Sequence, residues 1–280
     1  MTHDEQLGIR SRRFARYVAI GDSSTEGLDD PDGTGSFCGW ADRLATHVAE
    51  AQGELLYANL AVRGRRTRQI LDEQLEPALA MRPELATVFT GTNDMIQSGF
   101  KVSTVADDIE TIQRAFREAG ATALTFTAPD LSIVIPFASR VASRVASRVA
   151  AFNEMLRDVS ARTGTILLDF TKYPVASDPR LWSEDRLHAN ALGHARIAAA
   201  LACAIGIPGV DDHWADPLPP FQPPGVSTRV AMELRWAHRH FLPWAWRRAR
   251  GRSSGDGIVA KRPELSLVLA GSGYSDPGSR

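Results

Sequence analysis

The sequence predicts a three-layer α/β/α protein, in which a five-stranded parallel sheet lies between helices and is followed by a C-terminal extension. Two observations predict this fold. Short apolar segments alternate with segments of helical periodicity up to about residue 206, as in a parallel sheet with helical crossovers. Hydrophobic residues make up 44% of the 280-residue chain and charged residues 23%, a composition that supports a packed core.

The predicted elements follow one another in a regular order. Strands are expected at residues 17–20, 55–60, 85–90, 121–127 and 165–170. Helices are expected at residues 39–51, 67–81 and 102–119, in a long segment before residue 165, and at 191–205. The first helix carries its apolar residues at helical spacing, at Trp40, Leu44, Val48 and Ala51. Pro77 is expected to kink or split the second helix.

The long fourth helix contains a short repeat. Residues 139–150 read Ser-Arg-Val-Ala three times. A four-residue repeat drifts about 40° per copy on a helix. The apolar residues then fall within an arc of about 80°, at Val141, Val145, Val149, Phe152, Leu156 and Val159. This arc predicts a surface helix with one face toward the core and basic residues on the other.

The composition of the chain changes after residue 206, where the expected main domain of residues 16–206 ends. Residues 1–15 are expected to be an N-terminal tail, and residues 251–280, rich in glycine and serine, a flexible one. Residues 207–250 combine a proline-rich lead-in with a helix-compatible segment of tryptophans and arginines, which Pro243 is expected to kink or divide. Three roles are open for it: a strap folded on the domain, which we favour, a membrane-surface helix, or a partner-docking element.

Charge and cysteine content limit the partners. The net charge of −1 gives no reason to expect a nucleic-acid partner. No apolar run is long enough for a membrane span, and the N-terminus has no apolar signal region, so cytoplasm is the expected compartment. Cys38 and Cys203 are expected to be buried reduced thiols. The oligomeric state is left open.

Four short polar segments stand at the ends of strands or before the last helix. They are Gly21-Asp22-Ser23, Asn59 to Gly64, Gly91-Thr92-Asn93-Asp94 and Asp185-Arg186-Leu187-His188. Each alone is weak evidence. Together, in this order, they resemble the SGNH hydrolase family, the GDSL-type lipases and esterases, over about residues 16–206. The resemblance implies a flavodoxin-like parallel sheet.

Three of these residues fit the needs of ester hydrolysis. Ser23, with small neighbours, is the candidate nucleophile, and His188 the candidate base. Asp185, three residues before His188, is expected to orient it, as the resemblance also implies. His194 is the nearest rival base, but it falls inside the last predicted helix and lacks an acid three residues earlier. For His47, His213, His238 and His240 a packing or surface role is expected.

By resemblance, the backbone N–H groups of Ser23 and Gly64 and the side-chain amide of Asn93 form the oxyanion hole. Ala61 replaces a glycine often found in the family, which affects the shape of the loop more than the mechanism. Three arginines crowd this loop, Arg63, Arg65 and Arg66. They are interpreted as solvated surface charges, with a bias toward acidic substrates as the alternative.

The set predicts a serine esterase or acylhydrolase that acts through an acyl-enzyme on Ser23. A catalytically silent binding protein and an acyltransferase with the same triad are the alternatives. No metal-binding or phosphate-loop motif is present in the sequence, so no cofactor is expected. The substrate is a small-molecule ester or thioester, and the lack of a long lid-like insertion favours a short acyl group. The acyl length and the alcohol remain open.

Overall fold

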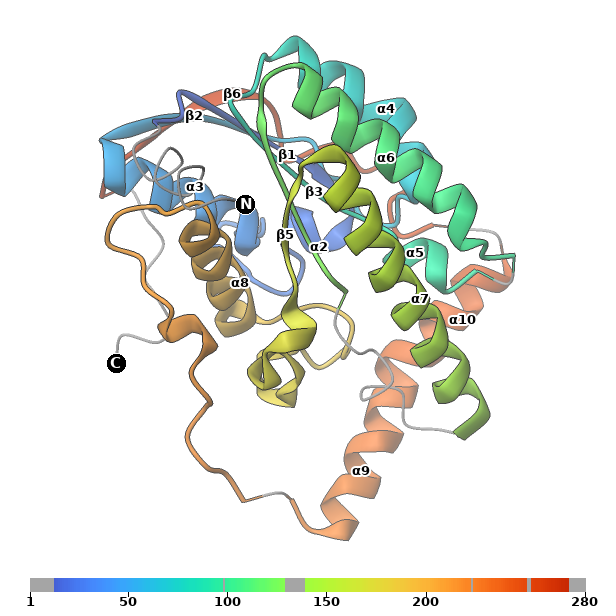
Figure 1. The fold of residues 1–280 in the computed structure, drawn as a ribbon. Coiled ribbons are helices and arrows are strands. Elements are labelled where there is room, and N and C mark those ends of the chain that lie inside the picture. The colour runs from blue at the N-terminus through green and yellow to red at the C-terminus, as the bar shows by residue number, and fades with distance from the viewer. Residues whose placement is uncertain (1–12, 98, 129–138, 223, 251–252, 272–280) are drawn as a thin grey trace.

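The computed structural model describes residues 13–97, 99–128, 139–222, 224–250 and 253–271. A six-stranded sheet forms its centre, in the order β5-β4-β3-β1-β2-β6 (Figure 1). The strands are β1 (Arg16–Gly21), β2 (Glu54–Asn59), β3 (Leu85–Phe89), β4 (Thr122–Phe126), β5 (Ile166–Leu168) and β6 (Arg262–Leu269). The first five are parallel, as predicted, and have the flavodoxin-like order.

The order in which strands are added to the sheet reverses at β1: β2 lies on one side of β1, and β3, β4 and β5 follow on the other. Tyr17 on β1 is in register with Tyr57 on β2 and with Leu85 on β3, so β1 lies between them. In open parallel sheets, the loops at the carboxyl ends of the strands on either side of such a point form the binding crevice. The segments after β1, β2 and β3 therefore meet at one edge of the sheet.

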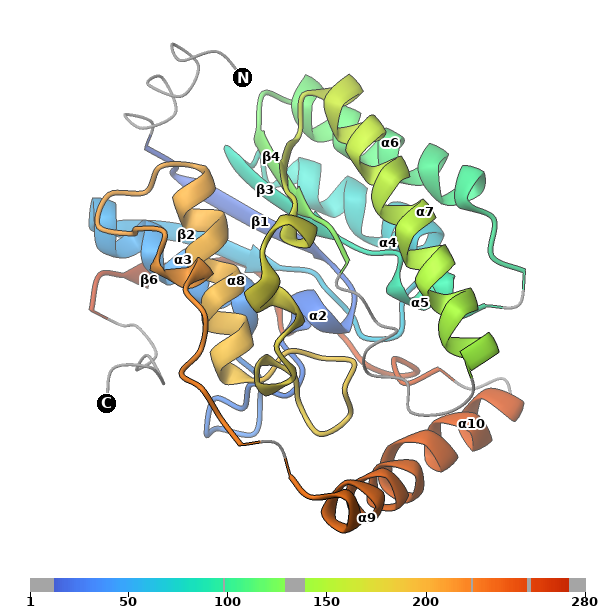
Figure 2. The ribbon, with the colours of Figure 1, turned by 60° about the horizontal axis from the view of Figure 1, so that its bottom comes forward.

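Helices cover both faces of the sheet (Figure 2). One face is covered by α3 (Gly39–Gln52) and α8 (Ala191–Ala204), around a core that includes Trp40 and Leu201. The other is covered by α4 (Thr67–Ala80), α6 (Val102–Glu118) and α7 (Ser139–Thr163). The short helices are α2 (Ser23–Glu26), α5 (Thr92–Met95) and the 3₁₀ helices η2 (Phe170–Lys172), η3 (Pro174–Ser177), η4 (Pro179–Leu181) and η5 (His213–Ala215).

The buried faces of the helices largely agree with the apolar periodicity of the sequence. In α7 the expected apolar face is buried at Val149, Phe152, Leu156 and Val159, while the side chain of Val141 lies outside the described residues. Pro77 does not split α4, which continues across it. Leu75 and Ala78 on either side of the proline are buried, and this packing keeps the helix continuous.

The prediction of a flexible tail over residues 251–280 is wrong for β6. This strand pairs antiparallel with β2, with Glu54 opposite Leu269 and Leu56 opposite Leu267. The pairing satisfies the backbone groups of β2, which would otherwise be the exposed edge of the sheet. The predicted count of five strands is therefore one short. The alternating apolar residues at 265, 267 and 269 were the available signal, and the glycine- and serine-rich surroundings obscured it.

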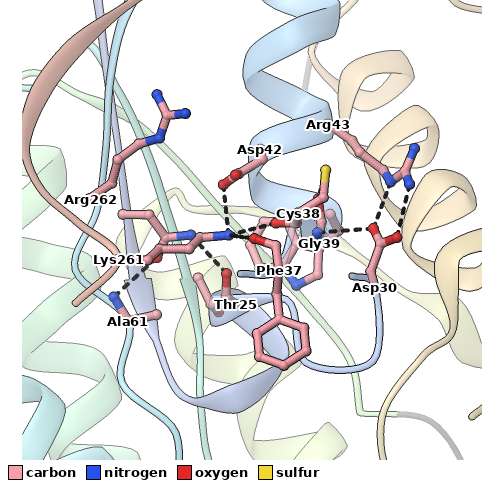
Figure 3. Close-up of polar contacts among 12 residues, drawn as sticks. Thr25, Asp30, Phe37, Cys38, Gly39, Asp42, Arg43, Ala61, Lys261 and Arg262 are labelled. Atoms are coloured by element: carbon pink, nitrogen blue, oxygen red, sulfur yellow. Dashed lines mark hydrogen bonds and ion pairs between the residues drawn. The ribbon is translucent and has the colours of Figure 1, made fainter. Parts of the chain in front are cut away.

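A buried ion pair fixes the segment before β6 to the body (Figure 3). Lys261 Nζ lies 3.0 Å from Asp42 Oδ1 and donates to the carbonyl oxygens of Phe37 and Cys38 at 2.7 and 2.6 Å. The side chains of Lys261 and Asp42 are only 12% and 6% exposed. Tyr57 donates its hydroxyl to the same carboxylate oxygen at 2.7 Å. The cluster joins α3, β2 and the C-terminal segment.

The C-terminal extension has two unlike parts. Trp214 on η5 is buried against Phe170 and Tyr173, and Arg196 donates to its carbonyl oxygen, so this part is a strap as predicted. The helical part does not fit the strap interpretation, because no residue of α9 (Val226–Trp236) or of the π-helix η6 (Ala237–Phe241) is buried. A third helix, α10 (Leu242–Ala249), follows. The segment is divided as predicted: the π-helix ends two residues before Pro243, the second residue of α10, and proline cannot donate to the carbonyl one turn earlier.

The structure also bears on the predictions for the N-terminal tail, the two cysteines and membrane-spanning segments. Of the predicted N-terminal tail, residues 1–12 lie outside the described part, and Phe14 is fully buried, so the packed region begins before residue 16. Cys38 and Cys203 are free thiols, Cys38 buried and Cys203 half-buried. Within the described ranges, no helix has the length and apolar character needed to cross a bilayer.

Candidate active site

Ser23 is the first residue of α2, directly after β1. Asp22 caps this helix, since its Oδ1 accepts from the backbone N–H of Ser24 at 3.1 Å. Gly21 stands directly before Asp22. A Cβ at this position would collide with the Thr25 side chain and with the Phe89 carbonyl, so only glycine fits the turn. The tight strand-to-helix turn places Ser23 at the crevice edge of the sheet.

The structure brings Ser23, His188 and Asp185 together. His188 Nε2 lies 2.7 Å from Ser23 Oγ, and His188 Nδ1 lies 2.6 Å from Asp185 Oδ2. With Asp185 ionised, the ring proton belongs on Nδ1, so Nε2 is left to accept the proton of Ser23. Residues 165 positions apart in the sequence thus form one continuous hydrogen-bonded chain.

The loop that carries Asp185 and His188 is held by its own polar groups. Asp185 Oδ1 accepts from the Ser183 hydroxyl at 2.6 Å and from the backbone N–H groups of Leu187 and His188 at 2.8 and 3.0 Å. Arg186 lies between them with φ of 64°, an unusual left-handed conformation for an arginine. This turn points Asp185 and His188 to the same side.

Electrostatics favour an ionised Asp185 and a basic His188. Burial opposes the charge of Asp185, but the hydrogen bond and the charge of His188 outweigh it and hold the Asp185 pKa well below its usual range. Burial also lowers the pKa of His188, but Asp185, with Asp29 and Asp22, raises it above its ordinary value overall. Burial raises the pKa of Asp22 to about 7.

Asp29 is a neighbour of the base that sequence analysis missed. Its Oδ2 lies 3.8 Å from His188 Nδ1, and its side chain is 40% exposed. Asp29 belongs to no sequence motif, because it stands in an irregular loop after α2. Its φ of 67° belongs to the region that asparagine and aspartate tolerate best.

Replacing Asp29 with asparagine is expected to move the pH profile. The carboxylate favours the imidazolium, so its loss lowers the His188 pKa and shifts the acidic limb of kcat/KM to lower pH, by about half a unit for a partly exposed pair. Ester hydrolysis measured from pH 5 to 9 checks this shift. A limb that stays in place or moves to higher pH contradicts the role given to Asp29.

His194, the rival base, has a different role. It is fully buried, its Nδ1 accepts from the Trp40 backbone N–H at 3.1 Å, and its Nε2 donates to the Leu28 carbonyl at 3.0 Å. Burial lowers its pKa to about 4. A neutral ring with both nitrogens engaged in this way links α3, α8 and the loop after α2, and it does not contact Ser23.

Asn93 links the loops that carry the other two predicted oxyanion donors. Its amide donates to Asp22 Oδ2 at 3.2 Å and to the Arg65 carbonyl at 3.0 Å. These residues are the direct neighbours of Ser23 and Gly64. Asp94 accepts from the backbone N–H and hydroxyl of Thr67 at 3.0 Å each and holds the start of α4. The predicted donors therefore lie on three adjoining segments.

The prediction of solvated surface charges fits Arg66 better than it fits Arg63 and Arg65, which form ion pairs. Arg63 forms an ion pair with the buried Glu26 of α2, with its Nε 2.9 Å from Oε1, and its guanidinium lies 5.2 Å from the Phe37 ring centroid. Arg65 pairs with Glu73 at 2.7 Å. Arg66 caps α4. The neighbours of Arg63 show that it braces the loop against α2.

The C-terminal region contributes to the site at two places that the sequence did not reveal. A Cβ at Gly64, where φ is 75°, would collide with the Ser253 hydroxyl, and one at Gly255 would collide with the Arg63 carbonyl. The turn at residues 253–255 therefore packs directly on the Gly64 loop. On the other side, Trp236 Nε1 donates to the Asp185 carbonyl at 3.0 Å.

An apolar pocket opens beside Ser23 and His188. Aromatic rings line its depth, with Phe89 and Phe126 stacked at 4.1 Å between centroids. Further lining residues are Phe170, Val175, Ala176, Leu181, Trp182, Leu187, Ile197 and Trp214. The arrangement can hold an apolar group whose polar end stands at Ser23.

Asp29, Asp185 and His188 are a group of the described residues that offers possible metal ligands, with atoms within 4.8 Å of one another. Asp185 and the Nδ1 of His188 are already bonded to each other. The cluster is therefore explained by the orientation of the imidazole.

Known proteins resemble this chain in sequence family and in fold. A family model described as GDSL-like Lipase/Acylhydrolase family matches residues 19–196. No curated protein matches. Among solved structures, a GDSL-like lipase from Parabacteroides merdae is 21% identical with a TM-score of 0.59, over 71% of this chain and 99% of that one. The lipase/acylhydrolase from Enterococcus faecalis is 23% identical with a TM-score of 0.54, over 70% and 96%.

An acetyl xylan esterase from Geobacillus stearothermophilus is 15% identical with a TM-score of 0.57, over 71% of this chain and 97% of that one. At these identities the similarity establishes the shared fold. The region after residue 196, which includes the strap, the C-terminal helices and β6, lies outside the matched family segment.

Proposed function

Because the chain belongs to the GDSL-like lipase/acylhydrolase family and is a hydrolase acting on ester bonds, we propose that it cleaves carboxylic esters through a covalent acyl-enzyme on Ser23. The observation that carries the proposal is the hydrogen-bonded chain from Ser23 Oγ through His188 to Asp185, at 2.7 and 2.6 Å. A nucleophile, a base and an orienting carboxylate in this order are the parts that acyl transfer needs.

In the first step, His188 Nε2 takes the proton of Ser23 as Oγ attacks the ester carbonyl. The carbonyl oxygen becomes an oxyanion, for which the backbone N–H groups of Ser23 and Gly64 are donors. The Asn93 amide becomes the third donor by releasing its hydrogen bond to Asp22 or to the Arg65 carbonyl. Collapse of this intermediate breaks the ester bond, and His188 returns the proton to the leaving alcohol. Water then attacks the acyl group with His188 again as the base, and the acid and free Ser23 are released.

The experiment that tests this assignment is labelling with a fluorophosphonate probe, followed by mass spectrometry of the peptides. We expect one adduct, on Ser23, and loss of labelling after prior incubation with an ester substrate in excess. An adduct on another residue, or an unlabelled protein that still hydrolyses p-nitrophenyl acetate, contradicts the assignment of Ser23. Absence of both labelling and hydrolysis supports the silent binding protein instead.

The apolar pocket supports an acyl group longer than acetyl, contrary to the preference for short acyl groups drawn from the missing lid. Each methylene buried there contributes about 0.8 kcal/mol, or about a factor of four in kcat/KM. The stacked Phe89 and Phe126 offer a ready surface for such a chain. The proposed substrate is thus an ester with an apolar acyl group.

Ala176→Trp is expected to narrow this specificity. Ala176 lines the pocket and is half-buried, so a large ring there occupies the space of the acyl chain. We expect kcat/KM for a p-nitrophenyl hexanoate to fall about tenfold or more relative to the acetate. Ala161→Trp, on the exposed face of α7, is the matched control. An unchanged ratio between the two esters would show that the acyl chain lies elsewhere.

Transfer to an alcohol in place of water uses the same residues. Product analysis with added glycerol or a sugar separates the two: free acid as the sole product supports hydrolysis, and an acylated acceptor supports the transferase.

A further inference from the structure

The helical segment of residues 226–250, here called the C-terminal arm, exposes large apolar side chains. Val226, Leu234 and Trp246 are 68%, 65% and 60% exposed. Val230, Met232, Phe241 and Leu242 are also exposed. Large apolar side chains gathered and exposed on one segment mark a surface that another body covers.

These side chains follow a regular spacing. Val226, Val230, Leu234, Leu242 and Trp246 are separated by four residues or by eight. Four-residue steps drift about 40° each on a helix, so these side chains form a band that winds along the arm, which is helical from α9 through η6 to α10. The half-buried residues have their own helical spacing, at Glu233, Trp236, Ala237, His240, Pro243 and Trp244. The arm therefore has one side toward the protein, and large apolar side chains are exposed on the remainder of its surface.

The arm is strongly basic within a chain that is nearly neutral. It holds six arginines against one glutamate, an excess of five positive charges, while the whole chain has a net charge of −1. The one glutamate, Glu233, is engaged by Arg186 outside the arm, with both hydrogen bonds at 2.8 Å. Arg235 and Arg247 are exposed. Exposed cations thus accompany the exposed apolar side chains of the arm.

We propose that the C-terminal arm docks the protein onto an anionic lipid bilayer. A helical segment that exposes tryptophan, phenylalanine and leucine side chains together with arginines can lie in the plane of a membrane interface, where apolar burial and the negative surface potential both contribute. A second copy of this chain is a poorer occupant, because the arginines of two facing arms would repel.

The arm is attached to the loop that carries Asp185. Trp236 donates to the Asp185 carbonyl at 3.0 Å, and the Arg186 guanidinium lies 5.1 Å from the Trp236 ring centroid. Both figures place α9 and α10 along one edge of the body, away from the sheet. A bilayer that covers the exposed apolar side chains of the arm therefore lies next to the loop of His188.

Co-sedimentation of the full chain with vesicles tests the proposal. Ser23→Ala protein is used, so that turnover does not alter the lipid and the result does not depend on the proposed function. We expect binding to phosphatidylcholine vesicles that contain phosphatidylglycerol, and much weaker binding to phosphatidylcholine alone. Arg235→Gln and Arg247→Gln should each weaken binding about fivefold. Leu234→Ser with Leu242→Ser should weaken it about tenfold or more.

Matched substitutions outside the arm keep the test specific. Val259→Ser removes an apolar side chain that is 82% exposed, and Lys172→Gln removes an exposed cation. Both should bind vesicles like the parent. The proposal is overturned if the full chain does not bind phosphatidylglycerol vesicles, or if the arm variants bind as well as these controls. It is also overturned if the arm variants instead dissociate a dimer seen by size-exclusion chromatography.

Discussion

Ser23→Ala is expected to lower kcat for p-nitrophenyl ester hydrolysis by about 10⁴-fold or more, with little change in thermal stability. The substitution removes the atom that forms the acyl-enzyme, and loss of a serine nucleophile from such a triad costs rates of this order. The Oγ lies 2.7 Å from His188 Nε2, so its removal costs that nitrogen one hydrogen bond, while His188 keeps its bond to Asp185 and the core is not disturbed. Steady-state kinetics and a melting curve measure the two effects.

The remaining activity of this variant reports on the other parts of the site. Asp185 still orients His188, and the donors of the oxyanion hole are still present, so a small residual rate above the uncatalysed reaction is expected. Ser36→Ala, in the loop before α3, is the control and should retain the parent rate. If Ser23→Ala kept a tenth of the parent rate, another nucleophile would have to be sought.

Lys261→Met is expected to lower the free energy of unfolding by about 3–5 kcal/mol, because it leaves a buried carboxylate without its cation. Asp42 is 6% exposed, and Lys261 also donates to two backbone carbonyl oxygens that lose their partner. Urea unfolding followed by tryptophan fluorescence measures the change.

Two further variants make the origin of this loss clear. Lys172→Met removes a 74% exposed lysine that lies 3.8 Å from Asp169, and it should change stability by less than about 1 kcal/mol. Adding Asp42→Asn to Lys261→Met removes the unpaired charge and should restore part of the loss, since an amide is cheaper to bury than an ion. If the double variant were less stable than Lys261→Met, the packing of the lysine stem and not its charge would be the cause.

The C-terminal region reaches the site from two directions. The turn at residues 253–255 packs on the Gly64 loop, and Trp236 of the arm bonds to the carbonyl of Asp185. Lys261 and β6 hold this region to α3 and β2. The oxyanion loop and the loop of the base are therefore braced by a part of the chain that lies beyond the matched family segment.

Much of the candidate site was predictable from short motifs. Ser23, Asp185 and His188 were predicted from segments at the end of a strand or before the last helix, and the order of four such segments gave the resemblance that also implied the role of Asn93. Asp29 and Trp236 were not, since neither belongs to a motif and each reaches the site through the path of the chain. Arg63 was interpreted as a surface charge because the sequence does not show that Glu26 lies beside it.

The sequence by itself determined the five parallel strands, the helices between them and the residues of the proposed triad. These depend on periodicity and on local turn chemistry, which act over a few residues. Only the tertiary structure decided how the C-terminal region folds and which of its residues are buried. Pairing of β6 with β2, the ion pair of Lys261 with Asp42 and the exposed side of the arm all depend on contacts between segments far apart in the chain. Such contacts are set by which edges and buried charges the folded body leaves to be satisfied, and no local pattern records them.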